Sequence, residues 1–203
     1  GGEVGQRIGH EFVGVVTAVG DEVRTLRVGD VVIAPPRWSD GTCEFCLAGL
    51  TSSCIDGGAW GEQGEDGAQG ERVRVPQADG TLVVVPRELT DDPGSLLALA
   101  CAMPTAHHAA VSAGVQWGST AVIVGDGAVG LCAVLAARRL GAEQIVVVGH
   151  HEDRLGIASA FGASDIVRAT AGDGLAAVEE VISRTGGAGS VLECAGVQSS
   201  WST

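Results

Sequence analysis

The amino-acid sequence predicts an α/β protein in which a β-rich N-terminal part precedes a doubly wound parallel sheet. An apolar run at residues 121–124 breaks into a glycine turn and an apolar, helix-like stretch at 131–140. A second apolar run at 144–148 completes a strand–helix–strand unit. Residues 11–20 and 31–34 are instead rich in branched residues and separated by glycine turns, a pattern typical of a small β-barrel.

Composition narrows the class of protein. The 203 residues are 45% hydrophobic and include 32 glycines, which indicates a globular, turn-rich chain. The net charge of −13 disfavours nucleic acid and anionic membranes as partners, because both attract clustered positive charge. No run approaches the roughly 18 apolar residues of a membrane span, and no basic start with an apolar core opens the sequence. We therefore expect a soluble, cytoplasmic protein.

The glycine turn that follows residues 121–124 matches a dinucleotide-binding motif. Three glycines stand at G-x-G-x-x-G spacing, which allows a tight turn, a close approach of backbone to a pyrophosphate and close helix packing. The N-terminus of the next helix would face the phosphates with its free N–H groups. We predict that the cofactor contacts the run Gly125, Asp126, Gly127, Ala128, Val129 and Gly130. A bare glycine-rich turn is the alternative.

A histidine–glutamate pair begins the β-rich part. The run G-H-E-x-x-G-x-x-x-x-x-G-x-x-V is met by Gly9, His10, Glu11, Gly14, Gly20 and Val23. This run resembles the zinc-containing alcohol dehydrogenases of the medium-chain dehydrogenase/reductase superfamily. The resemblance implies that His10 is a ligand of a catalytic zinc and that Glu11 orients the site or acts as an occasional ligand. The alternative is a solvated pair, or one that caps a turn.

Three cysteines follow at positions 43, 46 and 54. Closely spaced thiolates on one loop can share a tetrahedral zinc ion. The resembled family has a structural-zinc lobe of the form C-x-x-C-x-x-C-x7-C, and here the first position is Asp40, whose carboxylate can also bind zinc. We expect Asp40, Cys43, Cys46 and Cys54 to hold a structural zinc, bound more weakly or with more acid sensitivity than by four thiolates. The alternative is a metal-free loop with three free thiols.

Alternating residues at 71–76 and 81–86 predict a pair of strands around the turn Asp79-Gly80. Acidic residues and Pro93 then indicate the start of a helix. Cys101 ends the apolar run that follows, and the resemblance implies that it is another ligand of the catalytic zinc. Taken alone, it could be an inert core residue. His107 and His108 lie on the next helix and could approach the cofactor, or simply pack on the surface.

The end of the strand at 144–148 bears on the choice of dinucleotide. An acid there would bind the ribose 2′-hydroxyl of NAD, but the position is Gly149. His150, His151 and Arg154 offer donors for a 2′-phosphate. The sequence favours NADP over NAD, unless Glu152 is the acid in a shifted register. The remaining pattern predicts helices at about 153–161 and 174–184, and strands at 165–167 and 190–194; Cys132 and Cys194 are expected in the core.

The resemblance implies two domains. Residues 1–102 would form a GroES-like β-barrel catalytic domain with the structural-zinc lobe, and residues 103–203 a partial Rossmann dinucleotide-binding domain. Compared with full-length members of the family, the chain would be a fragment that lacks both ends. The missing N-terminal part would contain the first cysteine ligand of the catalytic zinc. The implied activity is zinc-dependent hydride transfer between an alcohol and an aldehyde or ketone, with His10, Glu11 and Cys101 as the catalytic and metal-binding residues and Zn²⁺ and NADP or NAD as cofactors.

Family members form homo-oligomers, so we expect a dimer or tetramer of the full-length protein. Two other functions stay open at this point. The chain could be a non-catalytic fragment that binds zinc and nucleotide. It could also be a zinc-free, quinone-reductase-like relative, although the cysteine cluster argues against that interpretation.

Overall fold

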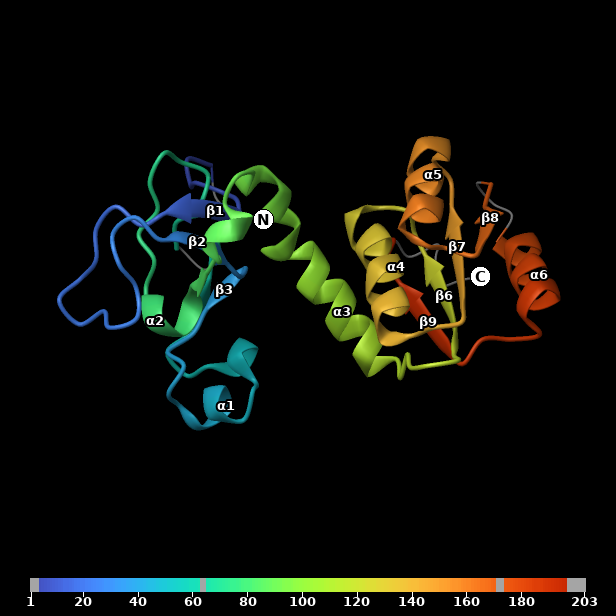
Figure 1. Ribbon diagram of the computed structural model, residues 1–203, viewed down its shortest axis with the longest axis horizontal. Coiled ribbons are helices and arrows are strands. Elements are labelled where there is room, and N and C mark those ends of the chain that lie inside the picture. The colour runs from blue at the N-terminus through green and yellow to red at the C-terminus, as the bar shows by residue number, and fades with distance from the viewer. Residues whose placement is uncertain (1–3, 63–64, 171–173, 197–203) are drawn as a thin grey trace. The chain divides into compact units, whose positions relative to one another are not determined.

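The computed structural model describes residues 4–62, 65–170 and 174–196. The chain divides into two compact units, the first ending at Cys101 and the second beginning at Ala102 (Figure 1). Each unit has its own sheets and its own core. Among the described residues, no helix combines the length and apolar character that crossing a bilayer requires.

Unit 1 is built from short antiparallel strands. One sheet has the order β1 (Phe12–Val15), β2 (Val31–Ala34), β5 (Val83–Val84), and a second pairs β3 (Arg37–Trp38) with β4 (Gly58–Ala59). Short helices and 3₁₀ turns connect them: α1 (Glu44–Leu47), η1 (Thr51–Ser53), α2 (Ala78–Thr81), η2 (Arg87–Leu89) and η3 (Pro93–Leu99). Leu96 and Ala100 pack with Ile33 and Val85, so the core of unit 1 joins η3 to the first sheet.

The predicted strand pair at 71–76 and 81–86 is wrong. Residues 71–76 lie in no strand, and β5 pairs with β2 instead. The intervening α2 is bonded to the loop at residues 24–25. Its Asp79 carboxylate accepts hydrogen bonds from the Arg24 N–H at 2.8 Å and from the Thr25 N–H and hydroxyl at 2.9 and 2.6 Å. These contacts make the segment a turn fixed to a distant loop rather than the tip of a hairpin.

Unit 2 is a parallel sheet with helices on both faces, as predicted. Helix α3 (Ala102–Ser112) leads into β6 (Thr120–Val124), α4 (Ala128–Leu140), β7 (Gln144–Gly149), α5 (Glu152–Phe161), β8 (Asp165–Arg168), α6 (Gly174–Thr185) and β9 (Ser190–Glu193). The strand order is β8-β7-β6-β9, and every pairing is parallel. Parallel strands need crossover connections, which the helices between them supply.

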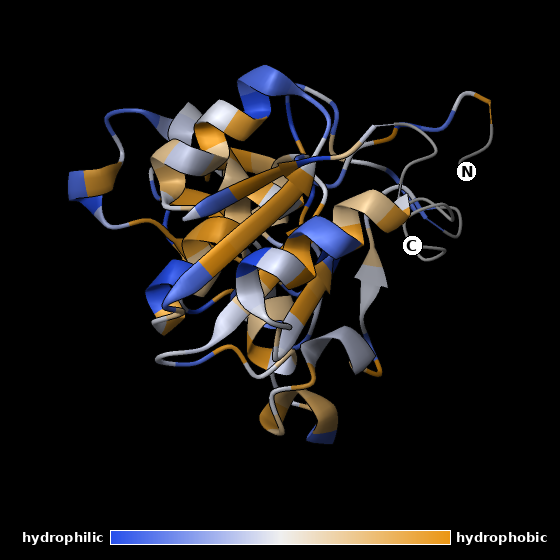
Figure 2. Cartoon of the chain, turned by 90° about the vertical axis from the view of Figure 1, so that its right-hand side faces the viewer, coloured by the Kyte–Doolittle hydropathy of each residue, from blue (hydrophilic) through white to orange (hydrophobic). Residues whose placement is uncertain are grey.

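The core of unit 2 has two parts, one on each face of the sheet. Ile123 and Val147 point to the face covered by α3, α4 and α5, where Cys132 is also buried. Val122 and Val146 point to the other face, which packs against α6. Figure 1 shows α4 and α5 on one side of these strands and α6 on the other, and Figure 2 shows the largely hydrophobic strands between them. Burial on both faces explains why β6 and β7 are continuous apolar runs.

Shortening a central side chain of this sheet should destabilise unit 2. The Ile123 side chain is fully buried, so Ile123→Ala should lower the free energy of unfolding by about 2–5 kcal/mol through lost burial and a residual cavity. Val191 lies on the edge strand of the same sheet and is 60% exposed, so Val191→Ala should change the free energy of unfolding by less than about 1 kcal/mol. Urea unfolding followed by circular dichroism measures both, and equal losses would contradict the described core.

Candidate functional site

The glycine turn lies at the carboxyl end of β6 and leads directly into α4. Gly125 has φ +115°, a left-handed conformation that favours glycine. A Cβ on Gly130 would lie 2.0 Å from the carbonyl oxygen of Gly125, so helix and strand approach too closely for any side chain there. No described side chain caps the N-terminus of α4. Its first N–H groups are therefore available to an anion such as a pyrophosphate.

Asp126 connects this turn to the end of the neighbouring strand β7. Its carboxylate is almost completely buried and accepts hydrogen bonds from the backbone N–H groups of His150 at 2.8 Å and His151 at 2.7 Å. The His151 ring also donates to it through Nδ1, at 3.0 Å. Burial opposes ionisation of Asp126, but these N–H donors outweigh it and hold the pKa of the carboxyl below its usual value. The predicted cofactor residues of both strands are thus brought together.

The first turn of α5 carries the other predicted phosphate donor. Arg154 Nη1 lies 3.9 Å from Asp126 Oδ1, and the Arg154 side chain is half exposed. Glu152, the alternative ribose acceptor, forms an ion pair with Arg168 at the end of β8. Exposed donors therefore lie near the end of β7, and the exposed Glu152 is already paired with a cation.

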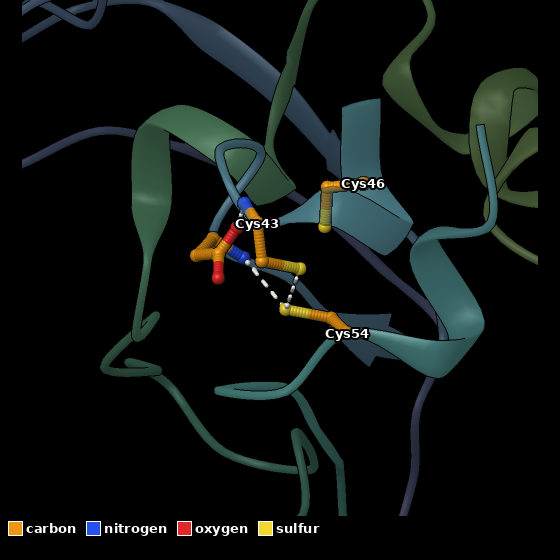
Figure 3. A group of neighbouring side chains, drawn as sticks. Cys43, Cys46 and Cys54 are labelled. Atoms are coloured by element: carbon orange, nitrogen blue, oxygen red, sulfur yellow. Dashed lines mark hydrogen bonds between the residues drawn. The ribbon is translucent and has the colours of Figure 1, made fainter. Parts of the chain in front are cut away.

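A cluster of four candidate zinc ligands forms in unit 1. One ligand atom from each of Asp40, Cys43, Cys46 and Cys54 lies within 4.8 Å of all the others. Cys43 Sγ is 3.9 Å from Cys54 Sγ, and the Asp40 N–H donates to Cys54 Sγ at 3.2 Å. Figure 3 shows the three sulfur atoms turned toward one another. Three thiols and one carboxylate form a donor set that fits tetrahedral zinc.

Local hydrogen bonds fix the carboxylate of this cluster. The Asp40 side chain accepts from the N–H groups of Cys43, at 2.8 Å, and Thr42, and these two bonds lower the pKa of its carboxyl. Loss of solvent around the Cys46 thiol raises its pKa to about 12. Backbone N–H groups of Ile55 and Cys46 instead lower the pKa of Cys43. A bound cation would deprotonate all three thiols.

A second group of metal-binding side chains lies at the start of β1 and after η3. Candidate ligand atoms of His10, Glu11 and Cys101 lie within 4.8 Å of one another. The segment that carries Cys101 reaches β1 because Leu96 and Ala100 pack into the core that includes Val13. His10 and Glu11 are exposed and Cys101 is partly buried, so this group is open to solvent on one side. Imidazole, thiolate and carboxylate are all zinc ligands, and the open side leaves room for a substrate.

The structure thus brings each predicted set of site residues together: the four-residue lobe, the trio at His10, and the glycine turn with the end of β7. Sequence reasoning missed the contact between Asp126 and position 149. A Cβ on Gly149 would lie 2.7 Å from Asp126 Oδ2, so the carboxylate fills the space of a side chain there. The available signal was the combination of an acid inside the glycine turn with a glycine at the end of the next strand.

Two family models match the chain. The first, for the alcohol dehydrogenase GroES-like domain, matches residues 2–87. The second, for zinc-binding dehydrogenases, matches residues 128–203. The two matches fall on opposite sides of the boundary between the two units.

Similar proteins include a medium chain reductase/dehydrogenase of an Acremonium species, 38% identical over 86% of this chain and 66% of that protein. An NADP-dependent isopropanol dehydrogenase of Entamoeba histolytica is 34% identical over 93% of this chain and 52% of its own length. Among solved structures, an alcohol dehydrogenase from a Thermus species superposes with a TM-score of 0.86 and 32% identity, covering 98% of this chain and 57% of that chain.

The chain thus spans between about half and two thirds of the length of these proteins. The predicted α/β fold class, with a GroES-like and a Rossmann-type part, agrees with the matched domains and with the parallel sheet of unit 2. The two domain matches and the shared sequence and fold show that the chain belongs to the zinc-dependent alcohol dehydrogenase family of the medium-chain dehydrogenase/reductase superfamily.

Proposed function

We propose that the chain is part of a zinc-dependent oxidoreductase that transfers a hydride between an alcohol and an aldehyde or ketone, with NADP or NAD as the second substrate. The observation that carries this proposal is the trio His10, Glu11 and Cys101, which places three zinc-binding groups together on an exposed surface of unit 1. The same chain holds a dinucleotide-type glycine turn in unit 2. These are the two components that alcohol oxidation by a nicotinamide requires.

The trio would hold the catalytic zinc. When bound, the zinc supplies a Lewis acid for the substrate oxygen, and the nicotinamide accepts or donates the hydride. His10 would contribute a ring nitrogen and Cys101 its sulfur atom. Glu11 would act either as a further ligand or by orienting the other groups. The exposure of His10 and Glu11 supports a site that substrate can reach.

The four-residue lobe would hold a structural zinc. Asp40, Cys43, Cys46 and Cys54 would supply four ligands to a tetrahedral zinc, which would leave no position for substrate. Its contribution is to crosslink the loop between β3 and β4, which contains only the one-turn helix α1 and the 3₁₀ turn η1. This is a stabilising role rather than a chemical one.

NADP is the cofactor that the residues support best. Gly149 provides no carboxylate for a ribose hydroxyl, whereas His151 and Arg154 provide exposed donors. A relative that is named an NADP-dependent isopropanol dehydrogenase is consistent with this choice. That relative also supports a small secondary alcohol, or the corresponding ketone, as the substrate class. We further propose a homo-oligomeric, cytoplasmic protein.

Removing the carboxylate from the lobe should weaken zinc binding. Asp40→Ala deletes one of four ligands, so the zinc affinity should fall by more than about tenfold. Asp40→Cys should instead bind zinc more tightly than wild type, because thiolates favour this ion. Competition with a chromophoric chelator measures each affinity.

Asp56→Ala is the matched control, since Asp56 is an exposed acid only two residues from Cys54. Zinc affinity in this variant should equal that of wild type. If Asp40→Ala behaved like Asp56→Ala, then Asp40 would not be a ligand of the lobe.

Loss of one ligand of the trio should sharply reduce turnover. We expect His10→Ala to reduce NADP-dependent oxidation of isopropanol by more than about a hundredfold, because it removes a zinc ligand. Absorbance of the reduced nicotinamide measures the rate. Glu88→Ala, which changes an exposed acid in η2, should retain wild-type activity. A wild-type chain that binds zinc and nucleotide but turns over no alcohol would instead support a non-catalytic binding fragment.

A further inference from the structure

Asp126 is an acidic residue whose carboxylate accepts hydrogen bonds from other groups of the protein. The residue is 5% exposed, although it lies between two glycines of the turn that leads into α4. Its carboxylate receives two backbone N–H groups, from His150 and His151, and the His151 ring. A buried carboxylate is stable only when it is paired in this way. The side chain therefore serves to fix the turn between β7 and α5.

The same side chain excludes any other side chain from position 149. A Cβ built on Gly149 would lie 2.7 Å from Asp126 Oδ2 and 2.8 Å from Asp126 Cβ, closer than real Cβ contacts. An aspartate at 149 would also bring two carboxylates together at the end of one strand. Since like charges at this distance repel strongly, the two acids cannot both be accommodated in their ionised forms.

Two hydrogen-bond donors are exposed around this turn. The side chains of His151 and Arg154 are 59% and 50% exposed, and each contacts the Asp126 carboxylate with only part of its donor capacity. The exposed Glu152 is paired with Arg168. A ribose 2′-hydroxyl is best recognised by a carboxylate acceptor, whereas a 2′-phosphate is recognised by donors such as these.

We propose that Asp126 is a positioning residue that sets the choice of dinucleotide: it holds the His150–His151 backbone and keeps an acid out of position 149, so that the turn accepts the 2′-phosphate of NADP. This inference rests on the proposed function, since it takes the glycine turn to bind the adenosine half of the cofactor. It assigns the preference to a residue buried beneath the site and not only to the exposed histidines and arginine.

The test measures the adenosine half alone, with adenosine 2′,5′-bisphosphate and 5′-AMP titrated calorimetrically into the full chain. Wild type should bind the bisphosphate at least about tenfold more tightly than AMP. Asp126→Ala should lose about tenfold in bisphosphate affinity and change little for AMP, because the donors are no longer held in place. Asp126→Asn preserves the shape of the side chain and should lose severalfold, which keeps the test valid if the alanine variant melts.

Position 149 supplies the second arm of the test. Gly149→Asp alone should weaken both ligands, because two carboxylates compete for one space. Combined with Asp126→Gly, which also removes the Cβ that would lie 2.8 Å from the new side chain, it should reverse the preference toward AMP, since the acid has been moved to the strand end. Asp165→Ala removes an acid that bonds to Gln144 and Arg184 at the other end of the same strands, and it should leave the ratio of the two affinities at the wild-type value.

The outcomes separate the two claims. An unchanged affinity ratio in both Asp126 variants would overturn the positioning role, as would a Gly149→Asp variant that prefers AMP as strongly as the double variant. A wild type that binds both ligands equally would overturn the inference while leaving nucleotide binding intact. A folded wild type that binds neither ligand would overturn the proposed function as well.

Discussion

The close approach of α4 to the end of β6 is the constraint on which the nucleotide side of the molecule depends. A Cβ on Gly130 would meet the Gly125 carbonyl oxygen at 2.0 Å, so α4 can begin where it does only because that position has no side chain. This glycine turn also directs Asp126 toward β7, where its carboxylate accepts hydrogen bonds from the N–H groups of His150 and His151. One steric constraint therefore fixes the turn, the start of α4 and the segment that leads into α5, and it leaves the uncapped N-terminus of α4 for an anion.

Unit 1 differs from unit 2 in that its strands are short and its core is small. Two clusters of metal-binding side chains occupy this unit, and they differ in their surroundings. In the cysteine lobe, backbone N–H groups lower the pKa of Asp40, while loss of solvent raises that of Cys46; a cation would compensate both the charge and the cost of deprotonation. The trio at His10 is more exposed, as chemistry on a substrate requires. The cysteine lobe is thus suited to a metal that crosslinks the chain, and the trio to a metal that a substrate can reach.

Much of unit 2 was predictable, because strands buried on both faces are continuous apolar runs and the helices between them begin and end at clear signals; β6, α4, β7 and α5 all lie where the sequence predicted them. The membership of the two groups of candidate metal ligands was also predictable, because it follows from residue type and spacing together with a family resemblance. Two features were not. Residues 71–76 alternate like a strand, but Asp79 is hydrogen-bonded to Arg24 and Thr25, which are more than fifty positions away in sequence. A local pattern cannot show such a contact. The fit of Asp126 against Gly149 is likewise a tertiary contact that no local pattern encodes.

We infer that one chain supplies a cysteine-rich zinc lobe and a separate zinc site at His10. X-ray absorption at the zinc edge, on the chain saturated with zinc and freed of excess metal, tests it most directly because it reports the ligand atoms themselves. Two such sites should give a first shell dominated by sulfur at about 2.3 Å, with a smaller contribution from nitrogen and oxygen at about 2.0–2.2 Å that includes the multiple scattering of an imidazole. A first shell of oxygen and nitrogen alone would contradict this arrangement, because it would mean that the thiols of the lobe do not bind the metal.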